Sequence, residues 1–109
     1  MATHKMGLKQ PYFNLIKCGK KTIELRLYDS SRRLINPDDK IIFQNGNIHI
    51  IVRVKGIIRA GNFDSLFDII DVRKTGLEEK DKAIRIMEQF YDKGAQRKFG
   101  VVAILIEKI

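Results

Sequence analysis

The alternation of apolar and polar side chains over residues 22–27 predicts a strand with one buried face. The apolar positions of this strand are Ile23, Leu25 and Leu27. Glu24 and Arg26 project from the other side and carry opposite charges. Because an unpaired buried charge is costly, we expect these two residues to pair wherever that side is covered.

A second alternating stretch predicts a β-hairpin. Residues 40–44 form an apolar strand pattern, Asn45-Gly46 follow, and residues 47–59 alternate again. Asn-Gly is a favoured pair for a type I′ turn, because both central residues of that turn have positive φ. Gly56 interrupts the second strand and predicts a bulge or a bend at that point.

Two further segments complete the predicted sheet. Residues 3–8 are a candidate for a short first strand. Residues 101–106 are apolar on both faces, which is typical of a central strand and not of an edge strand.

Helical spacing of apolar residues first occurs after Pro11, which suits the first turn of a helix. Gly19 is expected to end this helix, because glycine accepts the positive φ that often follows a helix. The residues expected to face the core from this helix are Tyr12, Leu15 and Ile16.

Two more helices are predicted in the second half of the chain. Asn62 is a typical N-cap, and the apolar spacing after it predicts a helix over residues 63–70. Thr75 and Glu78 form a capping-box pattern and predict the start of a third helix. The expected buried face of that helix consists of Ala83, Ile86, Met87, Phe90 and Tyr91. Residues 93–98 carry three basic side chains around a glycine and are expected to form a basic link.

The order of these elements predicts an α+β domain. We expect a small mixed sheet of about five strands that bends into a barrel, with about three peripheral helices. A chain of 109 residues suits one domain with one modest core, and no repeat divides it, so residues 1–109 are expected to be a single domain. This composition is compatible with a monomer.

Lysine and arginine outnumber aspartate and glutamate by 21 to 13, which gives a net charge of +8. This excess favours a polyanionic partner such as nucleic acid, although charge also serves solubility alone in many small domains. The apolar runs are too short to span a bilayer and no signal peptide is visible, so we expect a cytoplasmic protein with no membrane partner. One cysteine and two separated histidines lead us to expect no metal and no other cofactor.

Gly19, Lys21, Glu24 and Arg26 form the pattern G-x-K-x-x-E-x-R, which resembles the signature of the ASCH domain family. The resemblance extends over nearly all of the chain. It includes residues 98–104, where the last strand begins. It implies a PUA-like β-barrel fold. It also implies RNA binding, the usual proposal for the family, and a few members resemble hydrolases or nucleases.

The charge and the resemblance together predict a cleft lined by Lys21, Glu24 and Arg26 that binds RNA or a nucleotide-like small molecule. The basic residues expected to add phosphate contacts are Arg53, Lys55, Arg73, Arg97 and Lys98. The alternative is that Glu24 and Arg26 form only a structural ion pair that sets the register of the strand. Both interpretations remain open at the level of the sequence.

A second alternative is a ribonuclease or a hydrolase of modified nucleosides that uses the same cleft. One branch of the family resembles amidohydrolases with a catalytic lysine, a threonine nucleophile and a distant glutamate. Lys21 matches the lysine, but Glu24 stands in place of the threonine and residues 73–75 offer no carboxylate. That mechanism is therefore not expected, while hydrolysis that uses Glu24 as a base stays open.

Overall fold

The computed structural model describes all 109 residues and contains five strands and four helices. The strands are β1 (Thr3–Gly7), β2 (Ile23–Leu27), β3 (Lys40–Asn45), β4 (Ile48–Ala60) and β5 (Val101–Lys108). The helices are α1 (Tyr12–Lys17), α2 (Phe63–Phe67), α3 (Lys80–Phe90) and α4 (Lys93–Phe99), and two 3₁₀ turns are η1 (Arg32–Leu34) and η2 (Val72–Thr75). None of the helices is long and apolar enough to cross a membrane.

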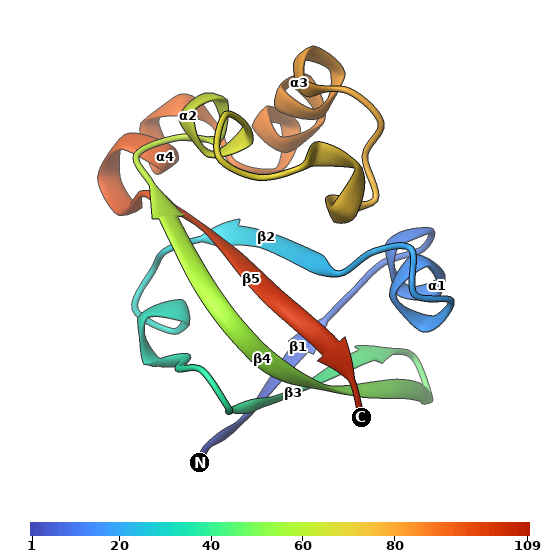
Figure 1. Cartoon of the computed structure of the whole chain (residues 1–109). Helices are drawn as coiled ribbons and strands as arrows, with labels where there is room; N and C mark the ends of the chain where they lie inside the picture. The colour runs from blue at the N-terminus through green and yellow to red at the C-terminus, as the bar shows by residue number, and fades with distance from the viewer.

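The five strands form one mixed sheet in the order β1-β3-β4-β5-β2. The pairing of β1 with β3 is parallel, and the other pairings are antiparallel. The sheet curls into a half-barrel whose two edges are β1 and β2 (Figure 1). The prediction that the last strand is central is confirmed, because β5 lies between β4 and β2.

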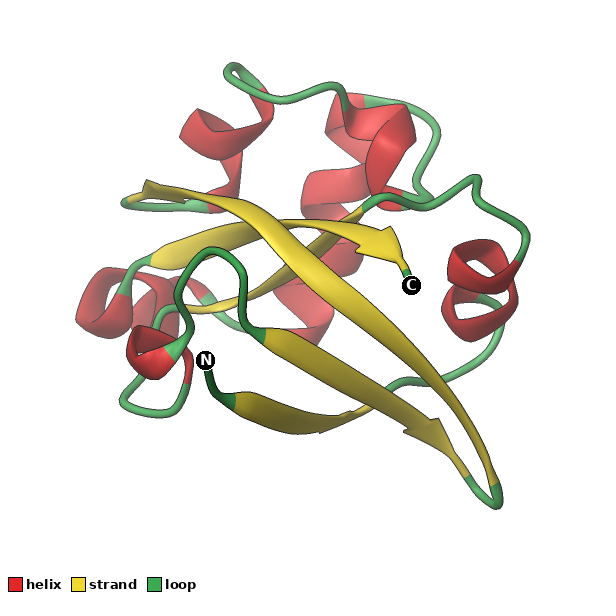
Figure 2. Cartoon of the chain, turned by 60° about the horizontal axis from the view of Figure 1, so that its bottom comes forward, coloured by secondary structure: helices red, strands yellow, loops and turns green.

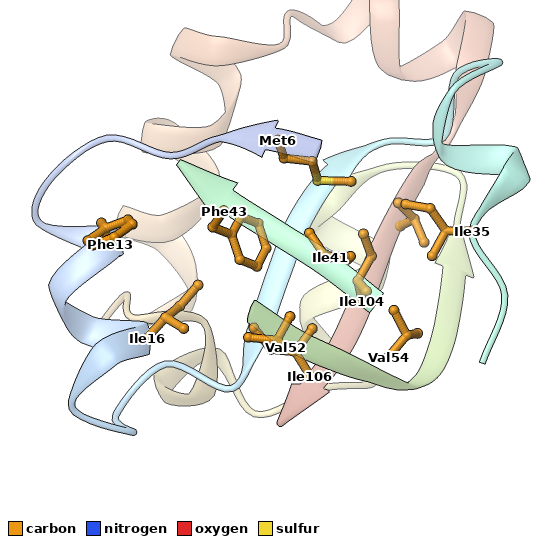
Figure 3. Close-up of a cluster of buried hydrophobic side chains, with 11 residues drawn as sticks. Met6, Phe13, Ile16, Ile35, Ile41, Phe43, Val52, Val54, Ile104 and Ile106 are labelled. Atoms are coloured by element: carbon orange, nitrogen blue, oxygen red, sulfur yellow. The ribbon is translucent and has the colours of Figure 1, made fainter. Parts of the chain in front are cut away.

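The alternation along β5 separates two hydrophobic cores, one on each face of the sheet. Val102, Ile104 and Ile106 belong to the first core, which also receives Phe13 and Ile16 from α1. Figure 3 shows these two α1 side chains pointing toward the strand residues. On the opposite face, residues of β2 and β5 pack against α2 and α3 in the second core. Glu24 pairs with Ile104 in register and therefore projects on the side of the first core.

The hairpin forms as predicted, but its turn lies one residue further along the chain. Asn45 pairs with Ile48, so the two residues of the turn are Gly46 and Asn47 (Figure 2). Gly46 has φ of +60°, and Asn47 is not among the non-glycine residues with positive φ. This pattern fits a type II′ turn, with glycine first, and not the predicted type I′ turn. The predicted irregularity at Gly56 is confirmed by a register shift between β4 and β5.

Three details of the predicted helices are wrong. In α1 the buried residues are Phe13 and Ile16, whereas Tyr12 and Leu15 are half-buried. The capping box does not form: α3 begins at Lys80, and the Thr75 hydroxyl donates to the Val72 carbonyl inside η2. Phe90 is 52% exposed and does not belong to the core.

Residues 93–98, expected to be a link, belong to the fourth helix, α4. The Asp92 side chain caps this helix by accepting a hydrogen bond from the Ala95 amide at 2.8 Å. Gln96 is its buried residue, and the Gln96 side-chain oxygen accepts a hydrogen bond from the Phe63 amide. The helix therefore packs through a polar side chain, which hides it from a search for apolar periodicity.

Candidate functional site

The turn between α1 and β2 carries Lys21 into the protein. Gly19 has φ of +87°, and the Gly19 amide donates to the carbonyl of Ile16. The Lys21 amide then donates to the carbonyl of Leu15 at 2.9 Å, which folds the chain back against the helix end. The Lys21 side chain is consequently buried, with 4% exposure.

Three acceptors surround the Lys21 ammonium. Its Nζ lies 2.8 Å from the Ile23 carbonyl, 2.7 Å from the Thr75 carbonyl and 3.0 Å from Glu24 Oε1. An ammonium has three N–H donors, so this set engages all of them. Gly76 lets η2 come this close, because a Cβ at position 76 would lie 3.1 Å from the Leu15 side chain and 3.4 Å from that of Lys21.

The other oxygen of Glu24 holds Arg26. Glu24 Oε2 accepts from Arg26 Nε at 2.8 Å and lies 2.7 Å from Arg26 Nη2. Arg26 Nη2 also donates to the carbonyl of Gly7 at 2.8 Å. Since Gly7 belongs to β1 and Arg26 to β2, this guanidinium bridges the two edges of the half-barrel. Arg26 Nη1 makes no hydrogen bond within the protein, and its donors remain available.

The charges of this network support one another. Burial by itself raises the pKa of Glu24, but the Lys21 and Arg26 cations outweigh burial and hold that pKa below its usual value. Burial lowers the pKa of Lys21, and the Glu24 carboxylate opposes this shift. Glu24 is therefore a carboxylate at neutral pH and serves as the anion for both cations.

The network forms one wall of a cavity of about 200 Å³. A second wall comes from the segment that joins β1 to α1, and the third comes from η2 and the end of α3. The lining residues are Gly7, Leu8, Lys9, Tyr12, Lys21, Glu24, Leu25, Arg26, Thr75, Leu77, Met87, Phe90 and Tyr91. The cavity thus combines one charged wall with mostly apolar and aromatic surroundings, a composition typical of small-molecule sites.

Of the eight residues predicted from the sequence, the structure brings Lys21, Glu24 and Arg26 together and places the other five outside the cavity. Arg53 pairs with Asp38 and Glu107 on the surface, and Arg73 pairs with Asp71. The remaining three, Lys55, Arg97 and Lys98, are exposed. The predicted phosphate contacts of all five residues stay a prediction.

Sequence reasoning missed several residues of the cavity. Tyr12 and Phe90 were expected in the core because of their helical spacing, yet both line the cavity. Thr75 and Leu77 come from a segment about fifty residues beyond the motif, and no local pattern links them to Lys21. No group of three or more His, Cys, Asp or Glu side chains is placed to hold a metal ion.

A family model for the ASCH domain matches residues 6–109. The chain belongs to the ASCH domain family. The predicted α+β fold with a small, bent mixed sheet is confirmed; the sheet forms a half-barrel, and four helices are present where about three were expected. ASCH domains are generally proposed to bind RNA.

Solved structures of similar proteins agree with this assignment. The hypothetical protein PH0355 is 41% identical, with a TM-score of 0.89 over 98% of this chain and 99% of its own. Protein PF0455 from Pyrococcus furiosus is 38% identical, with a TM-score of 0.79 over 98% and 97%. The ASCH protein from Zymomonas mobilis shares the fold at 18% identity, with a TM-score of 0.69 over 95% of this chain and 66% of its own. A search of curated proteins found no match.

Proposed function

We propose that this ASCH domain is a binding module that takes one base of an RNA, or a nucleotide-like small molecule, into the cavity beside Arg26. The observation that supports the proposal is the hydrogen bonding of the Arg26 guanidinium. Glu24 and the Gly7 carbonyl hold Arg26 on one side, while Nη1 has no partner in the protein. An arginine fixed in this way presents charged donors to a ligand without first losing side-chain freedom.

The walls of the cavity suit a flat, partly apolar group. Tyr12 and Phe90 supply aromatic rings, and Leu77 supplies an aliphatic surface. Bases stack on aromatic side chains and offer carbonyl and ring-nitrogen acceptors to arginine. A volume of about 200 Å³ lies below the range of roughly 300–1,000 Å³ for drug-sized ligands, which favours a single base over a larger group.

The same geometry argues against Glu24 as a catalytic base. A general base is most effective with a pKa near neutrality, but Lys21 and Arg26 contact the two Glu24 oxygens and hold the Glu24 pKa below its usual value. Lys21 in turn directs its three protons to acceptors inside the protein. These contacts favour binding over the hydrolase alternative. We also propose a cytoplasmic location for this module.

The test compares binding by the native protein, Arg26→Lys and Arg26→Ala. The probes are the common nucleoside 5′-monophosphates and a single-stranded RNA of about ten nucleotides. Binding is measured by calorimetry. We expect Arg26→Ala to bind roughly ten- to a hundred-fold more weakly, because a hydrogen bond to a charged group contributes about 1.5–3 kcal/mol. Arg26→Lys keeps a cation beside Glu24 and separates lost binding from lost stability.

Arg85→Ala is the matched control, because it removes the same charge from an exposed arginine outside the cavity. We expect it to retain most of the nucleotide affinity. Native affinity in both Arg26 variants, or a native protein that binds none of the probes, would overturn the proposed function.

A further inference from the structure

Six of the eight arginines of this protein fall into two groups by their partners. Arg32, Arg53 and Arg73 form ion pairs with surface carboxylates, and Arg26 pairs with the buried carboxylate of Glu24. Arg33 and Arg59 form no ion pair and instead lie against the ring of Tyr28. Their guanidinium carbons are 4.5 and 5.2 Å from the centre of that ring.

The Tyr28 ring restrains both guanidiniums without neutralising them. A cation over an aromatic face is attracted by the ring quadrupole, which keeps the full positive charge in place. Arg33 also donates from Nη2 to the carbonyl of Phe99 at 3.4 Å. Both arginines are exposed to solvent, and Lys98, whose Nζ lies over the Phe99 ring at 5.2 Å, adds a third cation to the same end of the molecule. The nearby Asp29 carboxylate is already paired with Arg32.

The register of the sheet connects this site to the cavity. Arg26 pairs with Val102 from β2, and Arg59 pairs with the same Val102 from β4, so both arginines project from one face. Tyr28 follows Arg26 by two residues at the end of β2, a separation of roughly 6–7 Å along a strand. Figure 1 shows β2 running from the side that carries α1 to the side that carries α4. One path along this edge strand therefore joins the cavity to the two arginines.

We propose that Arg33 and Arg59, held on Tyr28, form a phosphodiester-binding site for a single-stranded RNA that continues from the cavity along β2. This inference rests on the proposed function for the class of its ligand. The planar guanidinium matches the geometry of a phosphate group and donates two hydrogen bonds to it. No internal ion pair has to break before the phosphates bind. A free nucleoside monophosphate is too short to occupy both the cavity and this site.

The test uses the full chain, a labelled single-stranded RNA of about ten nucleotides and the nucleoside 5′-monophosphates. The variant is Arg33→Gln combined with Arg59→Gln. We expect it to lose at least ten-fold in RNA affinity and to flatten the plot of log affinity against log salt by about 1.4 units, because each of the two lost phosphate contacts to a single strand contributes about 0.7. Its affinity for the monophosphates should stay native. The control, Lys5→Gln combined with Lys40→Gln, removes the same charge from two exposed lysines outside both sites and should leave RNA binding nearly native.

The outcomes separate this site from the cavity. RNA affinity that falls with the Arg33 and Arg59 pair but not with Arg26→Ala supports this site and overturns the cavity. RNA affinity that depends on Arg26 alone overturns this site and leaves the cavity intact. An equal loss in the control pair also overturns this site, because it would reflect net charge only. A native protein that binds no RNA overturns both.

Discussion

Glu24 is the residue on which the site depends, because its carboxylate is shared by two cations that both lie in or beside the core. Lys21 reaches one oxygen, Arg26 reaches the other, and Glu24 itself is 4% exposed. A buried ion pair contributes little beyond its own desolvation cost when complete, but it destabilises strongly when one partner is removed. The structural and functional interpretations of the motif are therefore not exclusive. The same carboxylate whose loss would destabilise the fold also orients Arg26.

Glu24→Gln tests this interpretation at the scale of a residue. The substitution keeps the shape but leaves Lys21 and Arg26 without their anion, so we expect the free energy of unfolding to fall by roughly 3 kcal/mol. Chemical denaturation at neutral pH measures the change. Nucleotide affinity should also fall in the fraction that remains folded, because Arg26 loses its fixed orientation. A denaturation midpoint equal to that of the native protein would show that the contacts among Lys21, Glu24 and Arg26 do not contribute to the stability of the fold.

At the scale of elements, the strands were easier to predict than the connections between them. Alternation placed Glu24 and Arg26 on one face of β2, and the apolar run of β5 placed it in the centre of the sheet. The capping box at Thr75 was misleading, because its hydroxyl finds a closer partner in the carbonyl of Val72. The helix α4 carries a readable N-cap in Asp92, but its buried contact is made by Gln96. Prediction from local patterns relies on apolar faces and therefore misses a helix whose buried residue is polar.

The cavity was only half predictable for a related reason. The motif supplied its charged wall, since Lys21, Glu24 and Arg26 are close in sequence. The opposing wall depends on η2 and α3, which reach the motif through contacts such as the one from Thr75 to Lys21. A contact between residues that lie 54 positions apart leaves no trace in one sequence.

The β3–β4 turn offers the sharpest test at this scale. Gly46 has φ of +60°, a conformation that a β-branched residue resists. We expect Gly46→Val to lower the free energy of unfolding by about 1 kcal/mol or more. Gly61→Val is a suitable comparison, because Gly61 has open space around its Cβ position and no positive φ. Equal denaturation midpoints for the two variants would rule out the type II′ turn.

Across the whole molecule, the net charge is +8, but only some of the basic side chains are paired with carboxylates. Several basic residues on the surface are neutralised by neighbouring carboxylates, among them Arg53 and Lys80. The cations without such partners include Arg33 and Arg59, which lie at the end of the edge strand that carries Arg26. In the proposal above, the edge strand β2 is the path for a polyanion because it leads from Arg26 to these unpaired arginines.

The most direct test of the central claim is a nuclear magnetic resonance titration of the ¹⁵N-labelled protein with each common nucleoside 5′-monophosphate. If a base enters the cavity, the largest shifts should occur at the Arg26 Nε–H and at the backbone amides of Gly7, Lys9 and Leu77, which line it. The amides of Asp38, Asp39 and Lys40, none of which lines the cavity, should stay unchanged and serve as the internal control. Shifts confined to residues outside the cavity, or none at millimolar nucleotide, would contradict the account.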